Sequence, residues 1–130
     1  GMDAARTRGV HGTADLSTHF AMAGMLLAQG RTGDGMMVLK EAVELGDFVA
    51  AAHLNYGIQL RKLGKNTTAK NHLERAAKLN NYSAATHYHL AELYVGLTNR
   101  KKALQSLKRA VQIDPDYEDA RRKLAELQGQ

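Results

Sequence analysis

The residues best suited to chemistry in this sequence are histidines, and three of them recur at one interval. His19, His53 and His87 stand 34 residues apart (53 − 19 and 87 − 53). Imidazole is the commonest metal ligand in proteins and a frequent general acid or base. If the interval reflects stacked helices, the rings lie about 10 Å from one another, whereas the ligands of one Zn²⁺ ion each lie about 2 Å from the metal. We therefore expect the rings to pack between helices rather than to form one metal site.

Two other patterns could be taken for catalytic or binding sites. The segment GRTGDG at residues 30–35 is rich in glycine, but it lacks the preceding strand and the Lys-Ser or Lys-Thr ending of a phosphate loop. Four acidic residues crowd one turn near the C-terminus, where they suit the start of a helix: Asp114, Asp116, Glu118 and Asp119. The chain has no cysteine, which excludes disulfides and thiolate sites. We therefore expect no enzyme, no cofactor and no metal.

The formal net charge of +5 is unevenly distributed. Residues 1–49 carry four basic and six acidic side chains (4 − 6 = −2), and residues 50–130 carry fourteen and seven (14 − 7 = +7). A basic half can indicate an acidic partner or nucleic acid. Five basic residues gather in one segment: Arg100, Lys101, Lys102, Lys108 and Arg109. Because single-strand binding needs aromatic side chains between the charges and this segment has none, nucleic acid is only the second hypothesis for the partner.

Nothing in the sequence indicates a membrane span or a secretory signal. The apolar stretches are too short to cross a bilayer, and the first residues lack an apolar core. Gly1 ahead of Met2 resembles a remnant of tag removal, and residues 1–13 are expected to form a mobile N-terminal tail. We expect a cytoplasmic protein.

The interval of 34 residues extends well beyond the histidines. Small residues coincide at Ala23, Gly57 and Ala91. The same shift aligns four further columns: Leu39, Leu73 and Leu107; Ala42, Ala76 and Ala110; Gly35, Ala69 and Ala103; Leu26, Leu60 and Tyr94. A repeat of this length is typical of stacked helix pairs, because one pair cannot bury its apolar face alone. The columns predict small residues where two helices cross closely and leucines between the pairs.

Each repeat is predicted to contain two helices, because apolar residues recur with helical spacing. The predicted helices cover about residues 14–29, 33–46, 49–63, 67–79, 84–97, 101–113 and 117–128. Gly30 and Gly64 are expected in left-handed conformation at the turns inside the first two units. Thr98 holds the matching place in the third unit, where Asn99 is expected to take over the turn.

Two residues are predicted to cap helices through their side chains. Ser83 precedes the first helix of the third unit, and Asp116 precedes the final helix. The final helix is expected to cover the array, with Leu124 and Leu127 turned inward and charged residues outward.

These columns resemble tetratricopeptide-repeat (TPR) proteins, whose units carry the pattern W-x2-L-G-x2-Y, A-x3-F and P. The third unit reads His87-x2-Leu90-Ala91-x2-Tyr94, then Ala103-x3-Leu107 and Pro115. The other two units match at the same places but lack the proline, and His replaces Trp throughout.

The resemblance covers about residues 14–128, as one domain with repeats at about 16–49, 50–83 and 84–117 and a capping helix at about 117–128. It implies an all-α fold, namely a right-handed α-solenoid of three antiparallel helix pairs with a C-terminal solvating helix.

The resemblance also implies a function. In TPR proteins the first helices of successive units line a concave groove that holds an extended peptide or a helix of a partner. On this face, outside the stacking columns, lie the residues of the predicted partner-binding groove: Phe20, Leu27, Leu54, Asn55, Ile58, Arg61, Lys62, Tyr88, His89, Glu92 and Arg122. Clustered apolar side chains that stacking does not bury usually mark an interaction surface. We therefore expect a non-catalytic protein that binds an unidentified protein or peptide, with a self-associating scaffold as a further hypothesis.

One TPR ligand class is not expected. Chaperone-binding TPR domains hold a C-terminal carboxylate with basic and Asn side chains; the matching positions here are Phe20, Gly24, Asn55, Ala85 and His89. Only Asn55 fits that chemistry, so the ligand's carboxylates would remain unpaired. For the groove itself, Tyr88→Ala and Leu54→Ala are predicted to weaken partner binding without unfolding the array.

Overall fold

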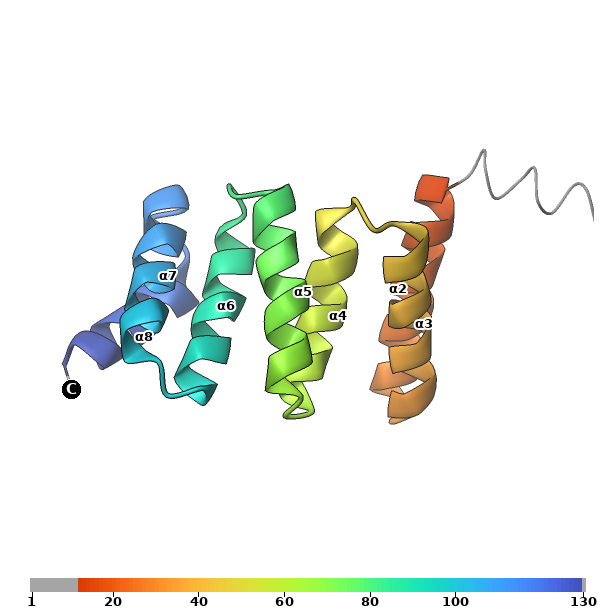
Figure 1. Ribbon diagram of the computed structural model, residues 1–130, viewed down its shortest axis with the longest axis horizontal. Coiled ribbons are helices and arrows are strands. Elements are labelled where there is room, and N and C mark those ends of the chain that lie inside the picture. Colours follow the sequence, from red (N-terminus) through yellow and green to blue (C-terminus); the bar gives the residue numbers. More distant parts are fainter. Residues whose placement is uncertain (1–11, 130) are drawn as a thin grey trace, which may run out of the picture.

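The computed structural model describes residues 12–129, and within this range it is built from helices alone (Figure 1). Gly1, His11 and most of the predicted tail lie outside the described residues. The helices are α2 (Gly12–Ala28), α3 (Thr32–Leu45), α4 (Ala50–Lys62), α5 (Asn66–Leu79), α6 (Ala84–Gly96), α7 (Arg100–Ile113) and α8 (Glu118–Gln128). Each begins and ends within two residues of its predicted bounds. The largest difference is at α2, which begins at Gly12 rather than at residue 14.

The turns inside the units confirm the predicted left-handed positions. Gly30 and Gly64 both have φ of +80°, a conformation that costs glycine nothing because it has no Cβ. Thr98 occupies the third turn with φ of +56°. The expectation that Asn99 would take over this turn is wrong: Asn99 is the N-cap of α7, and its Oδ1 accepts from the backbone N–H of Lys102 at 3.1 Å.

Of the two predicted caps, one is confirmed and one is wrong. The Ser83 hydroxyl oxygen accepts from the backbone N–H of Thr86 at 3.2 Å, at the start of α6. At α8 the N-cap is Tyr117, which makes no side-chain capping bond. The backbone N–H of Asp116 instead donates to Asp114 Oδ1 at 3.0 Å. Asp116 therefore belongs to a side-chain-stabilised turn before the helix.

The helices pack in consecutive pairs, α2 with α3, α4 with α5 and α6 with α7, and the pairs stack along the long axis of the molecule (Figure 1). The stacking columns are buried as predicted: Leu39, Leu73 and Leu107 are at most 3% exposed, and Ala42, Ala76 and Ala110 are fully buried. Two helices also approach closely at Gly57, where a Cβ would lie 2.8 Å from Leu73 Cγ and Cδ2.

α8 packs on α7 and ends the array, as predicted for a capping helix. Ala120 and Leu127 are its buried residues, and Leu124 lies at the edge of the same core. Arg121, Arg122 and Glu126 face solvent. None of the helices in the described range is long and apolar enough to cross a membrane.

Candidate functional site

A hollow lies between the first helices of units one and two, on the face that the repeat pattern predicts to bind a partner. It has a volume of about 180 Å³. Its walls come from α2, α3 and α4: Phe20, Ala23, Gly24, Leu27, Leu39, Asn55, Ile58 and Gln59. Four predicted groove residues therefore come together here, namely Phe20, Leu27, Asn55 and Ile58. All four are half-buried, so the hollow offers apolar walls beside one amide.

The hollow owes its shape to small side chains. Gly24 has no atom within 4 Å of the place where its Cβ would stand, and Ala23 is buried against the partner helix of its unit. A larger residue at either position would fill the space or push the helices apart. The small residues at positions 23 and 24 therefore leave a space on this face, and Phe20 and Ile58 line it.

Beyond the hollow, the same face carries a basic region where α4 meets α6. His89 of α6 lies close to Arg61 and Lys62 at the end of α4, and these two positive charges, together with burial as the larger cause, lower the pKa of His89 to about 4. His89 is therefore neutral at pH 7. Its Nδ1 and the Nε of Arg61 are buried, and neither has a hydrogen-bond partner among the described residues. Buried polar atoms without a partner are uncommon in folded proteins, so this region differs from the rest of the packed array.

Tyr88, Leu54 and Ile58 are tied to the core more closely than predicted. Each packs against the buried apolar cluster, and the Tyr88 ring lies 5.3 Å from the ring of Tyr117. Burial raises the pKa of Tyr88, and the nearby Glu92 carboxylate raises it further. The inference that nothing in the array explains Tyr88 is thus wrong, because Tyr117, which the sequence reasoning did not single out, covers it.

Glu92 and Arg122 lie at the far end of this face. Glu92 Oε1 is 3.9 Å from Lys123 Nζ, which links α6 to α8. Arg122 is exposed and pairs with Asp119 at 3.5 Å. It lines a separate surface hollow of about 360 Å³ with Glu118 and Arg121, which shares no residue with the hollow at Phe20. The structure therefore does not place Arg122 in the hollow at Phe20.

The three histidines of the 34-residue interval, His19, His53 and His87, pack between helices as predicted. His53 and His87 are 3% and 8% exposed, and each Nε2 lies against the backbone carbonyl six residues earlier, at 2.8 Å from Asp47 O and 3.0 Å from Asn81 O. His19 Nε2 lies 3.3 Å from Glu41 Oε2. The part of the chain that the structure describes contains no group of three or more side chains that could hold a metal ion.

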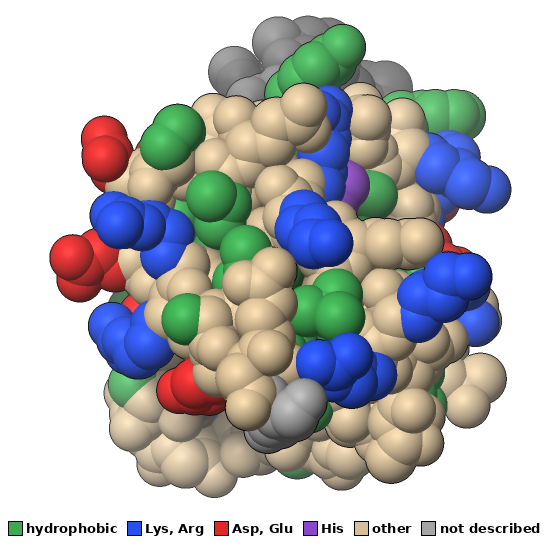
Figure 2. Space-filling view, turned by 90° about the vertical axis from the view of Figure 1, so that its left-hand side faces the viewer, with side chains coloured by type: hydrophobic (Ala, Val, Ile, Leu, Met, Phe, Trp, Pro, Cys, Tyr) green, Lys and Arg blue, Asp and Glu red, His purple; other side chains and the backbone are tan. Residues whose placement is uncertain are grey.

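The basic segment of α7 has aromatic neighbours that the sequence did not reveal. Lys102 Nζ lies 5.5 Å from the centre of the Tyr94 ring, and the Arg109 guanidinium lies 5.4 Å from that of Tyr82. Tyr94 is buried and donates its hydroxyl to Glu74 Oε2 at 2.8 Å, so only Tyr82 offers an exposed ring. Figure 2, which views the C-terminal end of the array, shows several Lys and Arg side chains with apolar side chains between them.

Comparisons with known proteins agree with this architecture. Residues 84–117 match the family model of the tetratricopeptide repeat, and the search of curated proteins finds no match. Among solved structures, the chain is similar to the first TPR domain of Spaghetti (RPAP3) bound to an HSP90 peptide, with a TM-score of 0.83 and 13% identity over 89% of this chain and 92% of that one.

Two further structures are similar. The Yersinia enterocolitica type III secretion chaperone SycD, solved with a peptide of the translocator YopD, has a TM-score of 0.77 and 16% identity over 86% of this chain and 88% of that one. The Thermobaculum terrenum O-GlcNAc transferase has a TM-score of 0.82 and 21% identity over 89% of this chain, but only 22% of the transferase chain is covered.

The identities to these structures are low, so the likeness concerns the fold. The matched repeat is the third unit, which also carries the fullest set of TPR positions in the sequence. Two units with the same columns precede it and stack on it in the same way. Residues 84–117 are thus a tetratricopeptide repeat, and the described residues as a whole have the helical solenoid fold of these TPR structures.

Proposed function

We propose that this protein is a non-catalytic interaction module that binds an extended peptide or a helix of a partner protein along α2, α4 and α6. The observation that carries the proposal is the hollow between α2 and α4. Its apolar walls and its asparagine side chain are the usual components of a specific binding site, in which a few polar groups orient an apolar anchor.

The size of the hollow limits what it can hold. A volume of about 180 Å³ equals about six water molecules at roughly 30 Å³ each. One aliphatic or aromatic side chain of a partner would displace them and bury apolar surface against Phe20 and Ile58. The Asn55 amide stands beside this anchor and can bond to a peptide group of the same ligand.

The basic region at His89 adds a preference for the rest of the ligand. Arg61 and Lys62 place positive charge next to a neutral imidazole, so an acidic or strongly polar residue of the partner is favoured there. A C-terminal carboxylate clamp is not part of the proposal, because His89 carries no charge at pH 7 and Phe20, Gly24 and Ala85 supply no donors. The RPAP3 domain and SycD, which have similar folds, were each solved with a bound peptide, and this supports a peptide as the ligand class.

The test is selection of binders from a displayed peptide library, followed by calorimetry with the selected peptide. Phe20→Ala is expected to weaken binding at least tenfold, as truncation of a central aromatic anchor does. The matched control is Phe48→Ala, which removes the chain's second phenylalanine from the α3–α4 turn, where it is 79% exposed. Thermal unfolding of both variants separates lost contacts from lost folding. Equal affinity of the Phe20→Ala variant and the wild type would exclude the hollow as the site.

Nucleic-acid binding is the second candidate function, and the observation that favours it is the cluster of basic residues on α7 beside the exposed Tyr82 ring. Such binding would weaken steeply as salt is added, because phosphate contacts release counterions. Filter binding of a labelled single strand at low and high salt decides between the two functions. Self-association and a cytoplasmic location are further parts of the sequence-based hypothesis; sedimentation at several concentrations tests the first.

A further inference from the structure

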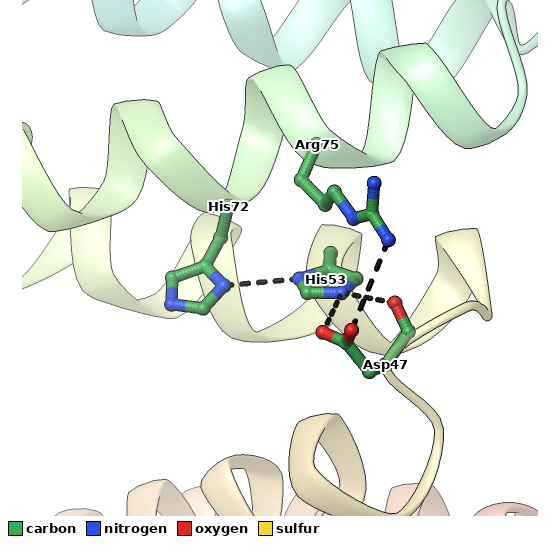
Figure 3. A network of polar contacts seen from close by, with 4 residues as sticks. All are labelled: Asp47, His53, His72 and Arg75. Carbon is green, nitrogen blue, oxygen red and sulfur yellow. Dashed lines mark hydrogen bonds and ion pairs between the residues drawn. The ribbon is translucent and has the colours of Figure 1, made fainter.

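His53 of α4 and His72 of α5 face each other through the same ring atom (Figure 3). Their Nδ1 atoms are 3.1 Å apart, and the rings are stacked at an interplanar angle of 24° with centroids 5.3 Å apart. His53 is buried and His72 is half-buried. The two residues, called the imidazole pair below, therefore share a single hydrogen bond in a partly buried site.

The neighbours of His53 fix where the protons lie. His53 Nε2 is 2.8 Å from the backbone carbonyl oxygen of Asp47 and 3.4 Å from Asp47 Oδ1. Both oxygens only accept hydrogen bonds, so Nε2 must carry its proton. In a neutral His53 ring the Nδ1 is then bare, and it accepts the hydrogen bond that His72 Nδ1–H donates. Hydrogen bonds thus assign both tautomers.

This arrangement tolerates one added proton but not two. A singly charged pair still holds one proton between the two Nδ1 atoms, and Asp47 balances the charge. A second proton would place two N–H groups against each other at 3.1 Å, with a positive charge on each ring. A second added proton therefore opposes the observed geometry, because it leaves no acceptor between the two rings.

The groups around the imidazole pair come from α4, α5 and the α3–α4 turn. Asp47 also lies 3.8 Å from Arg75 Nη2, and the Arg75 guanidinium lies over the Phe48 ring at 5.6 Å. The Tyr56 ring meets His72 edge-on at 4.8 Å. Burial lowers the pKa of His72 and the His53 ring lowers it further, whereas Asp47 raises it. The Asp47 carboxylate is already paired with the fixed positive charge of Arg75. It therefore offsets the charge of a doubly protonated imidazole pair less well.

The second imidazole is specific to unit two. The residues that correspond to His72 are Val38 in unit one and Ser106 in unit three (38, 72 and 106). In unit three His87 keeps its bond to the carbonyl of Asn81 without a histidine opposite. Packing of the histidine column therefore does not require His72.

We propose that the imidazole pair is a proton-sensitive latch that holds the α3–α4 turn and α5 against α4 at neutral pH and releases them when both rings are protonated. The latch lies where units one and two join, because Asp47 belongs to their connecting turn. Since α4 also supplies Asn55 and Ile58 to the hollow, acid would weaken ligand binding as well; this consequence alone rests on the proposed function.

Whether acid stabilises or destabilises the fold follows from the direction in which the pKa of His72 is shifted. A histidine whose pKa is lower in the folded state than 6.5 stabilises the fold fully above pH 6.5, and this stability is lost as the pH falls below that value. The unfolding equilibrium constant rises by up to about tenfold per pH unit for each proton taken up only by the unfolded chain.

The test compares the wild type with His72→Asn and His72→Ser. Asparagine offers an N–H near the position of Nδ1 and does not titrate, and serine is the residue of unit three. Urea unfolding is followed from about pH 7.5 to about pH 5 without any ligand, a range that brackets the ordinary histidine pKa. The asparagine variant is expected to match the wild type at the upper pH and to be the more stable protein at low pH, because its side chain takes up no proton. The serine variant is expected to start less stable and to lose less on acidification, so its curve approaches that of the wild type at low pH. If all three proteins lose stability in parallel, the imidazole pair is no latch.

A local measurement supports the global one and does not depend on the stability of a variant. In the wild type, hydrogen exchange is corrected for intrinsic rates at each pH. Acidification is expected to open the α3–α4 turn, reported by the Val49 N–H that bonds to Gly46 O at 2.9 Å, more than the α5–α6 turn, which lacks an imidazole pair. Equal opening of both turns would overturn the proposal.

Discussion

The close contact between α4 and α5 at Gly57 provides a test of the repeat register. Gly57 lies in the middle of α4, and an added Cβ there would stand 2.8 Å from two atoms of Leu73 on α5. Gly24 lies in the interior of α2, one residue after Ala23, the equivalent of Gly57, and its Cβ would meet nothing within 4 Å. The same substitution to alanine thus adds one methyl group to a packed contact in one case and to open space in the other.

The expected magnitudes follow from helix propensity and packing. Alanine stabilises a helix interior by about 1 kcal/mol relative to glycine, and Gly24→Ala is expected to show this gain. In Gly57→Ala the gain is opposed by overpacking, which costs about 1–3 kcal/mol, because Leu73 is fully buried and cannot turn away. We expect the Gly57→Ala protein to be between equally stable and about 2 kcal/mol less stable than the wild type, and always less stable than the Gly24→Ala protein.

Urea unfolding monitored by circular dichroism measures these differences, and a thermal scan should reproduce them at about 4 °C per kcal/mol for a chain of this size. Leu73→Ala alone should cost about 2–5 kcal/mol through the cavity it leaves. In the Gly57→Ala background it should cost about 1–3 kcal/mol less, because the new methyl group occupies part of that cavity. If both alanine variants were stabilised to the same extent, α4 and α5 would not meet at Gly57 and Leu73 and the register would be wrong.

Two further predictions concern α6. Ser83→Ala removes the hydroxyl that accepts from Thr86 N–H and is expected to lower the unfolding free energy by about 1 kcal/mol. Asp116→Ala removes no capping bond and should change the unfolding free energy much less. Equal losses in the two variants would contradict the assigned N-caps. The pKa of His89 is lowered from 6.5 to about 4, so the stability that the neutral ring contributes is complete above pH 6.5 and is lost as the pH falls toward 4. The full shift corresponds to about 3 kcal/mol. Because solvent screens this half-buried ring, the expected loss is about 1–2 kcal/mol. A ¹H–¹³C titration of His89 in the free protein checks the value directly, and an unshifted titration near pH 6.5 would refute it.

The parts of the fold that follow from sterics at a fixed period were predictable from the sequence. A small residue must stand where two helices cross, so the columns through Ala23 and Leu73 identify the helix pairs and their stacking. The left-handed turns are predictable for the same reason at Gly30 and Gly64, since a residue without Cβ is favoured there. Thr98 shows the limit, because a threonine can take the same conformation at an energetic cost that tertiary packing compensates.

The parts that depend on a single side chain outside the columns were not predictable. Tyr117 comes after the last repeat, so no period indicated that it would cover Tyr88. His72 has Val38 and Ser106 at its equivalent positions, so no column indicated its contact with His53. Asp116 fails as a cap because α8 begins at Glu118, so that Tyr117 stands at the N-cap position; the residue types alone do not fix this boundary to one residue.

The candidate site was predictable in its location but not in its shape. The periodicity indicated the face that α2, α4 and α6 present, and Phe20, Leu27, Asn55 and Ile58 do line one hollow. Whether a half-buried residue lines a hollow or packs on the core depends on its rotamer and on its neighbours. Leu54 and Tyr88 pack on the core, so substitutions at these two positions are expected to affect folding as well as binding. Phe20 is therefore the better probe of binding.

The most direct test of the account is an NMR titration of the isotope-labelled protein with a peptide selected for binding. Saturable shift changes are expected for the backbone and side-chain signals of Phe20, Asn55, Ile58 and His89, with small changes along α3, α5 and α7. Changes confined to the basic residues of α7, or the absence of any saturable change on α2 and α4, would contradict the proposal that this helical array binds its partner along the first helices.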